Sequence, residues 1–278
     1  MSDQKKHRHT SRKSHGCFGE TDRPSGARDN SPGCRGHGET ALLAALLDPL
    51  RSLFFPSHCA GCACAVPEGT NLCGACDESI EKIRPPRCEV CSQPYSGNIP
   101  AFTCPNCRGD TFHFDCAIAV VRSRGVVREM VHRLKYGKEL WLGRILAGWT
   151  SEGLEDQRLE GWTPDALVPV PLHPRRLRER EFNQAEILCQ ELSRISGIQV
   201  FSPLARRRYT TTQTRLDRKG RRQNLRDAFI LRKNGNVMNM NLLLVDDVLT
   251  TGSTLDACAA VLLEAGARSV RALTAARG

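Results

Sequence analysis

The sequence of 278 residues lacks a hydrophobic run long enough to cross a bilayer, since the longest purely apolar stretch near its start is 41–47. That stretch follows a polar tail of forty residues, which is the wrong place for a secretory signal. Aromatic residues make up only 5%, so a core has to be built mainly from Leu, Val, Ala and Ile. The fourteen cysteines are fewer than a small disulfide scaffold carries. We therefore expect a cytoplasmic protein with no membrane span and with reduced thiols.

Composition divides the chain into four segments. Residues 1–40 carry almost no large apolar side chains, so we expect a disordered tail. Residues 41–56 are apolar on all sides, which predicts a short helix docked on the domain that follows. Residues 57–112 hold paired cysteines without apolar periodicity, and residues 113–278 regain the periodicity of a globular domain.

Short apolar runs alternate with amphipathic helical patterns in the last segment. The predicted strands cover 116–122, 166–170, 242–245 and 270–274. The predicted helices cover 126–134, 185–195 and 254–264. Asn183 is placed to cap the second helix and Gly266 to close the third. This alternation predicts an α/β fold with a mainly parallel sheet.

Four Cys-x-x-Cys pairs fall within 49 residues. They are formed by Cys59 and Cys62, Cys73 and Cys76, Cys88 and Cys91, and Cys104 and Cys107. Two such pairs close one tetrahedral Cys₄ site, which suits zinc, so we predict two structural Zn²⁺ ions in successive zinc ribbons. Cys64 and Cys116 lie close enough in the sequence to replace a ligand. An iron–sulfur cluster is the competing interpretation, because four thiolates also suit clusters.

Near the C-terminus, a buried strand leads into two carboxylates, Asp246 and Asp247, and then into a turn that opens a helix. The turn consists of Thr250, Thr251, Gly252, Ser253 and Thr254. Backbone N–H groups at a helix N-terminus, together with these hydroxyls, form a phosphate site. The adjacent acids can accept hydrogen bonds from vicinal hydroxyls or hold a hydrated Mg²⁺ ion. Phosphate and diol recognition side by side predicts a ribose 5-phosphate ligand.

This stretch resembles the signature with which type I phosphoribosyltransferases bind 5-phosphoribosyl 1-diphosphate (PRPP). Together with the cysteine pairs, it resembles the ComF family of late-competence, amidophosphoribosyltransferase-like proteins over about residues 50–278. Further matches are His132-x-x-Lys135-Tyr136, 168–173, 182–185, 212–214, 221–224 and 228–229. The resemblance implies a type I phosphoribosyltransferase-like, mainly parallel sheet preceded by a double zinc ribbon.

The same resemblance implies which residues form the site. Asp246 and Asp247 would be the catalytic acids that orient the ribose, with Mg²⁺ bound alongside PRPP. The implied PRPP contacts are Lys135, Arg175, Arg176, Gln213, Arg221, Val248, Thr250, Thr251, Gly252, Ser253 and Thr254. One residue departs from the family pattern, which usually has glycine where this chain has Glu181. If that glycine has a positive φ, Glu181 is strained; if it admits an anion, Glu181 repels the anion.

The formal charge of +10 equals the surplus within residues 171–234, which hold sixteen Lys and Arg against six acids. A cationic loop in this window fits the phosphates of PRPP, and the alternative is a surface for single-stranded nucleic acid. Few aromatic residues are interleaved there, which makes base stacking poor.

Two functions follow from the resemblance. In the first, the chain is a glycosyltransferase that transfers a phosphoribosyl group, with pyrophosphate release, to an acceptor that the sequence does not identify. In the second, it is a non-enzymatic competence protein that handles DNA, with single-stranded DNA or a DNA-uptake helicase as partner and PRPP as a regulatory ligand. Glutamine-dependent amidotransfer is disfavoured, because no glutaminase-like region precedes the cysteine pairs.

Overall fold

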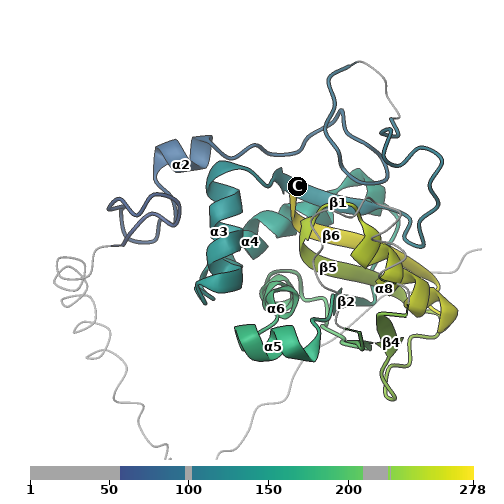
Figure 1. Ribbon diagram of the computed structural model, residues 1–278. Coiled ribbons are helices and arrows are strands. Elements are labelled where there is room, and N and C mark those ends of the chain that lie inside the picture. The colour runs from purple at the N-terminus through teal and green to yellow at the C-terminus, as the bar shows by residue number, and fades with distance from the viewer. Residues whose placement is uncertain (1–56, 98–101, 209–224, 226) are drawn as a thin grey trace, which may run out of the picture. The chain divides into compact units, whose positions relative to one another are not determined.

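The computed structural model describes residues 57–97, 102–208, 225 and 227–278. The predicted tail, the predicted helix at 41–56, and the proposed ligand contacts Gln213 and Arg221 lie outside these residues. A parallel sheet of four strands forms the centre, in the order β1-β6-β5-β2 (Figure 1). Its strands are β1 (Ala117–Arg122), β2 (Ala166–Pro169), β5 (Asn241–Leu249) and β6 (Ser269–Arg277). This architecture confirms the predicted α/β fold.

Helices cover both faces of the sheet. The helices α3 (Gly125–Tyr136), α4 (Leu142–Ser151) and α6 (Gln184–Ser196) pack on one face, and α8 (Ser253–Glu264) packs on the other. The alternation of side chains along β5 provides both contacts, since successive residues of a strand point to opposite faces. Leu243 and Val245 belong to the core beneath α3, α4 and α6, whereas Leu242 and Leu244 belong to the core beneath α8.

Smaller elements connect these layers. They are α2 (Gly74–Glu78), two short 3₁₀ helices (Glu152–Glu155 and Gln157–Leu159), α5 (Pro174–Arg180), and an antiparallel pair of strands, β3 (Leu204–Arg206) and β4 (Phe229–Leu231). No helix in the described part of the chain is long and apolar enough to cross a membrane.

The cap of α6 is confirmed and serves a second purpose. The Asn183 side chain accepts a hydrogen bond from the Ala185 N–H and donates one to the Val170 carbonyl, each at 3.1 Å. One amide therefore starts the helix and fixes the segment that follows β2. The strand predicted at 242–245 is too short, however. Pairing with β6 continues through Asp246 opposite Thr274 as far as Leu249, so both carboxylates lie inside β5.

The outer edge of β1 is covered by the segment that carries the cysteine pairs. The Ala117 N–H donates to the Val90 carbonyl at 2.7 Å, and the Ser92 hydroxyl donates to the Ala117 carbonyl at 2.9 Å. Further along the same edge, the Ile83 N–H donates to the Val120 carbonyl at 2.7 Å. The cysteine segment therefore forms hydrogen bonds with backbone groups at the outer edge of β1.

Candidate PRPP and zinc sites

A cavity of about 590 Å³ opens at the carboxyl ends of β2 and β5. Its volume falls in the range of about 300–1,000 Å³ that is typical of small-molecule sites. The two parallel strands are neighbours, so the segments that follow them meet at one edge of the sheet, which is where ligands bind in open α/β sheets. The cavity wall combines carboxylates from β5, hydroxyls from the turn before α8, and basic side chains from α3, α5 and β3.

The turn Thr250–Thr254, which we call the phosphate loop, opens α8. Gly252 is the N-cap residue of this helix with a φ of 79°, a left-handed conformation that glycine adopts without strain. The hydroxyls of Thr251 and Ser253 lie 3.0 Å apart, and both residues line the cavity together with Thr250 and Thr254. The first N–H groups of a helix lack partners within the helix and carry its positive dipole end. This arrangement is of the kind that binds anions at helix N-termini.

The two carboxylates have different surroundings. Asp247 is buried, and its Oδ2 lies 2.7 Å from the Nζ atom of Lys135 on α3. Asp246 accepts a hydrogen bond from the Asp247 N–H at 2.9 Å. Burial and the adjacent Asp247 carboxylate raise the pKa of Asp246 to about 7, although Lys135 opposes the shift. Lys135 thus neutralises Asp247, and Asp246 is the carboxylate better placed to accept hydrogen bonds from a ligand.

Basic side chains outnumber the acids around the cavity. In the described part of the chain, six basic residues line it against two carboxylates: Arg128, His132, Lys135, Arg176, Arg180 and Arg206. Arg180 is buried, with its guanidinium 4.9 Å from the ring of Tyr136 and one N–H donated to the Tyr136 hydroxyl at 3.3 Å. Burial and these contacts fix the Arg180 guanidinium in place. The excess of basic side chains means that the cavity favours a ligand with several negative charges.

Several residues singled out in the sequence line this cavity. Lys135, Arg176 and Val248 line it, as do the hydroxyl residues of the phosphate loop. Arg175 instead has an exposed side chain whose Nε lies 3.0 Å from Glu179, so its contact with PRPP remains a prediction.

Sequence reasoning counted Arg180 and Arg206 in the cationic window 171–234 but named neither of them, nor Gln184, as a PRPP contact. All three line the cavity. Gln184 is 4% exposed, and its Oε1 has no hydrogen-bond partner among the described residues. Gln184 lies within a matched motif, which was the only available signal. Arg206 reaches the site through a strand pairing that a linear pattern does not reveal.

Glu181 occupies a left-handed position at the C-terminal end of α5, with a φ of 72°. Of the two roles considered for the usual glycine, the structure therefore supports the conformational one. The Glu181 carboxylate lies 2.7 Å from the Lys138 Nζ, and both side chains are more than half exposed. Glu181 is absent from the cavity wall, which contains its neighbour Arg180.

The second half of the cysteine segment, Cys88–Cys107, which we call ribbon two, fits a zinc ion. The sulfurs of Cys88, Cys91, Cys104 and Cys107 are buried and lie within 4.8 Å of one another. Those of Cys91 and Cys104 are 3.6 Å apart. Zn–S bonds of about 2.3 Å place tetrahedral sulfurs about 3.8 Å apart, whereas a disulfide needs about 2.05 Å. The spacing therefore matches ligands around one metal ion.

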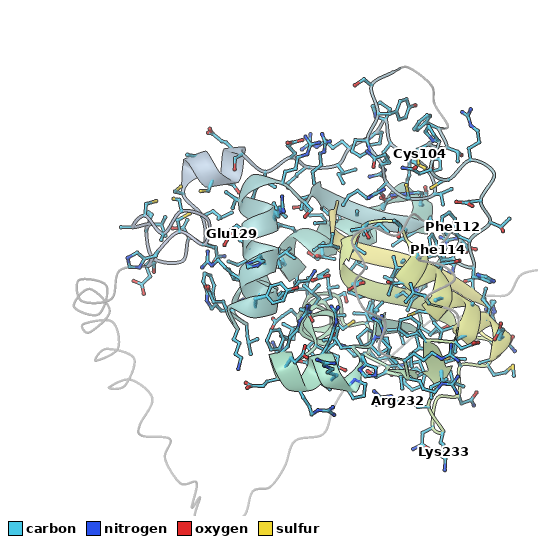
Figure 2. All side chains as sticks on the ribbon, in the orientation of Figure 1. Cys104, Phe112, Phe114, Glu129, Arg232 and Lys233 are labelled. Carbon is cyan, nitrogen blue, oxygen red and sulfur yellow. The ribbon has the colours of Figure 1, made fainter. Side chains whose placement is uncertain are left out.

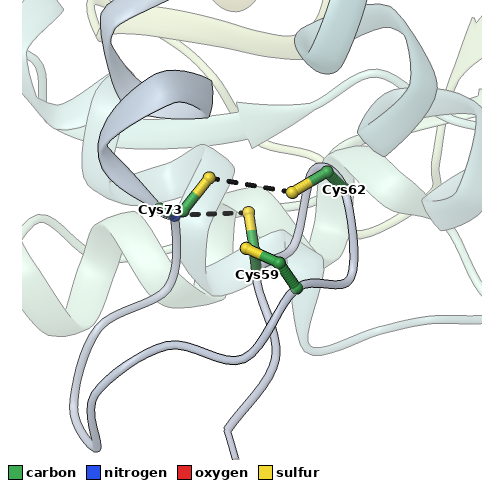
Figure 3. A group of neighbouring side chains, drawn as sticks. Cys59, Cys62 and Cys73 are labelled. Atoms are coloured by element: carbon green, nitrogen blue, oxygen red, sulfur yellow. Dashed lines mark hydrogen bonds between the residues drawn. The ribbon is translucent and has the colours of Figure 1, made fainter.

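The first half, Cys59–Cys76, which we call ribbon one, has a similar geometry. The sulfurs of Cys62 and Cys73 are 3.7 Å apart, and the Cys73 N–H donates to the Cys59 sulfur at 3.3 Å (Figure 3). Although burial opposes it, hydrogen bonds from the backbone of Cys62, Cys73 and Gly61 lower the pKa of Cys59 to about 6. A thiol with this pKa is largely a thiolate at pH 7, which is the form that binds metal.

Ribbon one holds a fifth thiol beside the four predicted ligands. The sulfur of Cys64 lies within 4.8 Å of those of Cys59, Cys62 and Cys73. The predicted ligand Cys76 also lies beside these three thiols, and burial together with their proximity raises the pKa of Cys76. A tight turn brings Cys64 to this group, since the Cys59 N–H donates to the Cys64 carbonyl at 2.8 Å and Ala63 has a φ of 60°. Cys76 as the fourth ligand stays a prediction.

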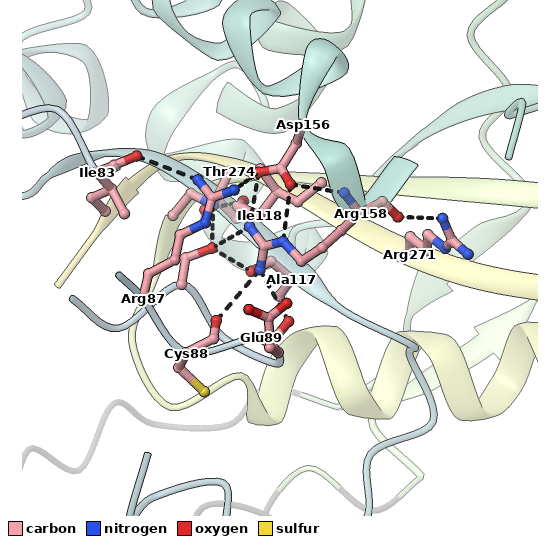
Figure 4. Close-up of polar contacts among 12 residues, drawn as sticks. Ile83, Arg87, Cys88, Glu89, Ala117, Ile118, Asp156, Arg158, Arg271 and Thr274 are labelled. Atoms are coloured by element: carbon pink, nitrogen blue, oxygen red, sulfur yellow. Dashed lines mark hydrogen bonds and ion pairs between the residues drawn. The ribbon is translucent and has the colours of Figure 1, made fainter. Parts of the chain in front are cut away.

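Ribbon two is fixed to the sheet by an ion-pair network (Figure 4). Asp156 lies 2.8 Å from Arg87 and 2.9 Å from Arg158. Arg158 also donates to the Glu89 carbonyl at 3.0 Å and to the Ser92 hydroxyl at 2.9 Å. Although burial opposes it, Arg158 and Arg87 hold the pKa of Asp156 below its usual value. Arg158, held by Asp156, thus binds ribbon two at Glu89 and Ser92, and the Ser92 hydroxyl in turn donates to β1.

Family models match both halves of this arrangement. A double zinc ribbon domain matches residues 50–108, and a phosphoribosyl transferase domain matches residues 184–278.

Curated relatives cover most of the chain. Competence protein F of Haemophilus influenzae is 31% identical over 79% of this chain and 95% of its own length. DNA utilization protein YhgH of Escherichia coli is 32% identical over 75% of this chain and 92% of its own. Competence protein ComFC of Bacillus subtilis is 29% identical over 74% of this chain and 84% of its own. Among solved structures, the glutamine phosphoribosylpyrophosphate amidotransferase of B. subtilis is 19% identical with a TM-score of 0.31, over 51% of this chain and 26% of that one.

Proposed function

The chain belongs to the ComF family, which includes Competence protein F, and on this premise we propose that it binds PRPP and transfers its phosphoribosyl group with release of pyrophosphate. The observation that carries the proposal is one cavity in which a phosphate loop, the Asp246 carboxylate and six basic side chains meet. These groups together complement a ligand that carries both several negative charges and a vicinal diol, as PRPP does. Reduced thiols as metal ligands fit a cytoplasmic location.

Each part of the cavity takes one part of PRPP. The 5-phosphate binds the phosphate loop, where backbone N–H groups and hydroxyls converge at the start of α8. The ribose hydroxyls donate to Asp246, whose carboxylate lines the same wall. The pyrophosphate group lies toward Arg176 and Arg180 on α5. The unpartnered Oε1 of Gln184 accepts a hydrogen bond from the bound ligand.

The chemistry is displacement of pyrophosphate from C1 of the ribose by an acceptor. Positive charge develops on the ribose and negative charge on the departing pyrophosphate, so fixed cations at the pyrophosphate end lower the barrier. Arg180, held in place by Tyr136, is preorganised for this purpose. The acceptor stays undefined, because no described residue stands out as a base that would activate it.

The donor set around Asp246 fits Mg²⁺. Carboxylate and hydroxyl oxygens are hard ligands, and Mg²⁺ binds through one or two carboxylates together with substrate phosphates. Asp246 and Asp247 are the residues that would hold the ion, with Asp247 restrained by Lys135. When bound with PRPP, the ion supplies charge neutralisation on the pyrophosphate.

Calorimetry of the full chain with PRPP and Mg²⁺ tests binding, and an assay of pyrophosphate release over a panel of acceptors tests transfer. Arg176→Gln should weaken binding about tenfold, the cost of one charge-assisted hydrogen bond of about 1.5 kcal/mol. Arg178→Gln is the matched control, because Arg178 lies on the same helix with an exposed side chain and does not line the cavity. Equal losses in the two variants would reduce the effect to net charge and refute the assigned site.

A second candidate function is binding of single-stranded DNA. Its support comes from the names of the relatives and from two exposed aromatic side chains, Tyr136 (62% exposed) and Trp141 (49%). Aromatic platforms beside cations bind single strands by stacking, and Arg180 and Arg144 belong to the same region. Fluorescence anisotropy with a labelled oligonucleotide, repeated over a salt series, tests this function. Salt-dependent binding that Trp141→Ala abolishes, together with PRPP binding without any pyrophosphate release, would favour a DNA-handling protein with PRPP as regulator.

A further inference from the structure

One buried arginine connects ribbon two to the phosphate loop. Arg277, near the end of β6, is 8% exposed. Its Nε donates to the carbonyl of Cys91 at 3.1 Å, and its guanidinium also donates to the carbonyl of Leu249 at 3.1 Å. A third N–H group lies 3.9 Å from the Cys91 sulfur. Cys91 belongs to the metal-binding group of ribbon two, and Leu249 directly precedes the phosphate loop.

A second contact joins the same two regions. The segment that leads from ribbon two into β1 lies against the start of α8, with Phe112 and Phe114 stacked at a ring separation of 4.8 Å (Figure 2). A Cβ atom on Gly252 would come within 3.5 Å of both rings. The His113 N–H donates to Asp256 in the first turn of α8 at 2.8 Å. The underside of the phosphate loop therefore rests on chain that is continuous with ribbon two.

Ribbon one contacts a different part of the molecule. Arg133 on α3 donates to the carbonyl of Ala60, and it forms a 2.8 Å hydrogen bond with Glu139. A Cβ atom on Gly61 would meet the Val126 side chain at 2.8 Å, which shows how closely ribbon one lies against α3. Arg133 thus contacts a backbone carbonyl of ribbon one, and Arg158 and Arg277 contact backbone carbonyls of ribbon two. Of these three arginines, Arg277 alone also contacts the residue that precedes the phosphate loop.

We propose that ribbon two is the support of the phosphate loop, and that Arg277 is the positioning residue that couples metal occupancy of ribbon two to anion binding. The proposal rests on the proposed function in taking PRPP as the anion. Ribbons of this size fold with their metal, so loss of zinc releases the Cys91 carbonyl and the segment at 112–114. The Leu249 carbonyl then keeps its 2.9 Å bond from the Gly278 N–H, but the Arg277 guanidinium that also donates to it is no longer fixed by Cys91. Coupling between two sites is reciprocal, so PRPP must retain zinc in ribbon two as strongly as zinc favours PRPP.

The first experiment follows zinc release from the full chain into a chelator with a colorimetric zinc indicator, with and without PRPP and Mg²⁺. PRPP should slow the release of one of the two ions. Arg277→Lys keeps the charge but cannot donate in several fixed directions, so it should bind PRPP about fivefold to tenfold more weakly and lose this protection. Arg133→Lys is the matched control and should keep both. Protection that persists in Arg277→Lys would overturn the proposal.

The second experiment needs neither PRPP nor a variant. Hydrogen exchange measured by mass spectrometry on the parent chain, during stepwise zinc chelation, reports ribbon one, ribbon two and residues 250–256 in separate peptides. Exchange at 250–256 should rise together with opening of ribbon two and should not follow opening of ribbon one. If ribbon two opens while 250–256 stays protected, the coupling is refuted. If exchange behaves as expected but PRPP does not bind, the coupling stands and the proposed ligand is wrong.

Discussion

The raised pKa of Asp246 makes PRPP affinity depend on pH in a defined direction. The pKa of about 7 in the free protein means that the native state holds this proton more tightly than the unfolded chain does. The stability of the free protein should therefore fall as pH rises from about 4 to about 7. Ribose hydroxyls donate to the ionised carboxylate, so binding opposes protonation, and affinity should rise with pH over the upper part of this range.

The magnitude follows from the ionised fraction. With a pKa of about 7, about one tenth of the free protein carries an ionised Asp246 at pH 6 and about nine tenths does at pH 8. The contribution of Asp246 to affinity should therefore change by about tenfold between these two pH values. At pH 7, binding should release about half a proton from Asp246.

The assay is isothermal titration calorimetry at pH 6 and pH 8, with parent and Asp246→Asn, in buffers of different ionisation enthalpy. The phosphates of PRPP also titrate in this pH range. Their effect cancels in the ratio of parent to variant affinity, because both proteins bind the same ligand at each pH. Asp246→Asn should bind about tenfold to a hundredfold more weakly at pH 8, since a charged hydrogen bond contributes about 1.5–3 kcal/mol. At pH 6 most of that difference should disappear.

Circular dichroism must first show that Asp246→Asn is folded, because this residue lies inside β5. A ratio of parent to variant affinity that is the same at pH 6 and pH 8 would refute the titration of Asp246. Equal affinity of the two proteins at pH 8 would remove Asp246 from the PRPP site altogether.

Three further outcomes are expected. Cys76→Ser should lower the zinc content measured by elemental analysis from two ions to one, and Cys64→Ser should leave two, because Cys76 is buried beside Cys59, Cys62 and Cys73 whereas Cys64 is exposed; the reverse ranking would make Cys64 the ligand. Glu181→Gly should be more stable to urea than Glu181→Ala by about 0.5–1 kcal/mol, since only glycine relieves the left-handed φ; its PRPP affinity should match that of the parent. Gly252→Ala and Gly197→Ala replace glycines with φ values of 79° and 76°, so each variant should lose about 1 kcal/mol of unfolding free energy. Only Gly252→Ala should bind PRPP more weakly than the parent. Equal PRPP affinities of the two variants would contradict the assigned loop.

The parts of the fold that sequence reasoning found are those encoded locally. The residues from Leu242 to Thr254 form a strand, two carboxylates and the start of a helix in one continuous stretch, so the pattern can be recognised directly in the sequence. The paired cysteines likewise carry their own spacing, and Asn183 caps its helix through a residue two positions away. In each case the interacting groups are near neighbours in the sequence.

The parts that sequence reasoning missed depend on distant pairing. The strands β3 and β4 are three residues each, and a run this short has no usable periodicity until its partner is known. Helix α4 carries two glycines, Gly143 and Gly148, within ten residues, and glycine disfavours a helix, so its apolar residues were not recognised as a helix. The role of Arg277 depends on carbonyl groups that no side-chain pattern reports.

The covered edge of β1 has a consequence for how the domains can be separated. A strand at the border of a sheet offers a row of free backbone groups to any other extended chain, and proteins guard such borders against self-association. In this protein Ile83, Val90 and Ser92 of the cysteine segment form hydrogen bonds with the backbone of β1 and so cover its edge. A fragment that begins at residue 113 would contain the complete parallel sheet, but the backbone groups at the outer edge of β1 would be exposed and could pair with a second copy. Expressed alone, it should therefore aggregate strand to strand even if its own core is fully formed.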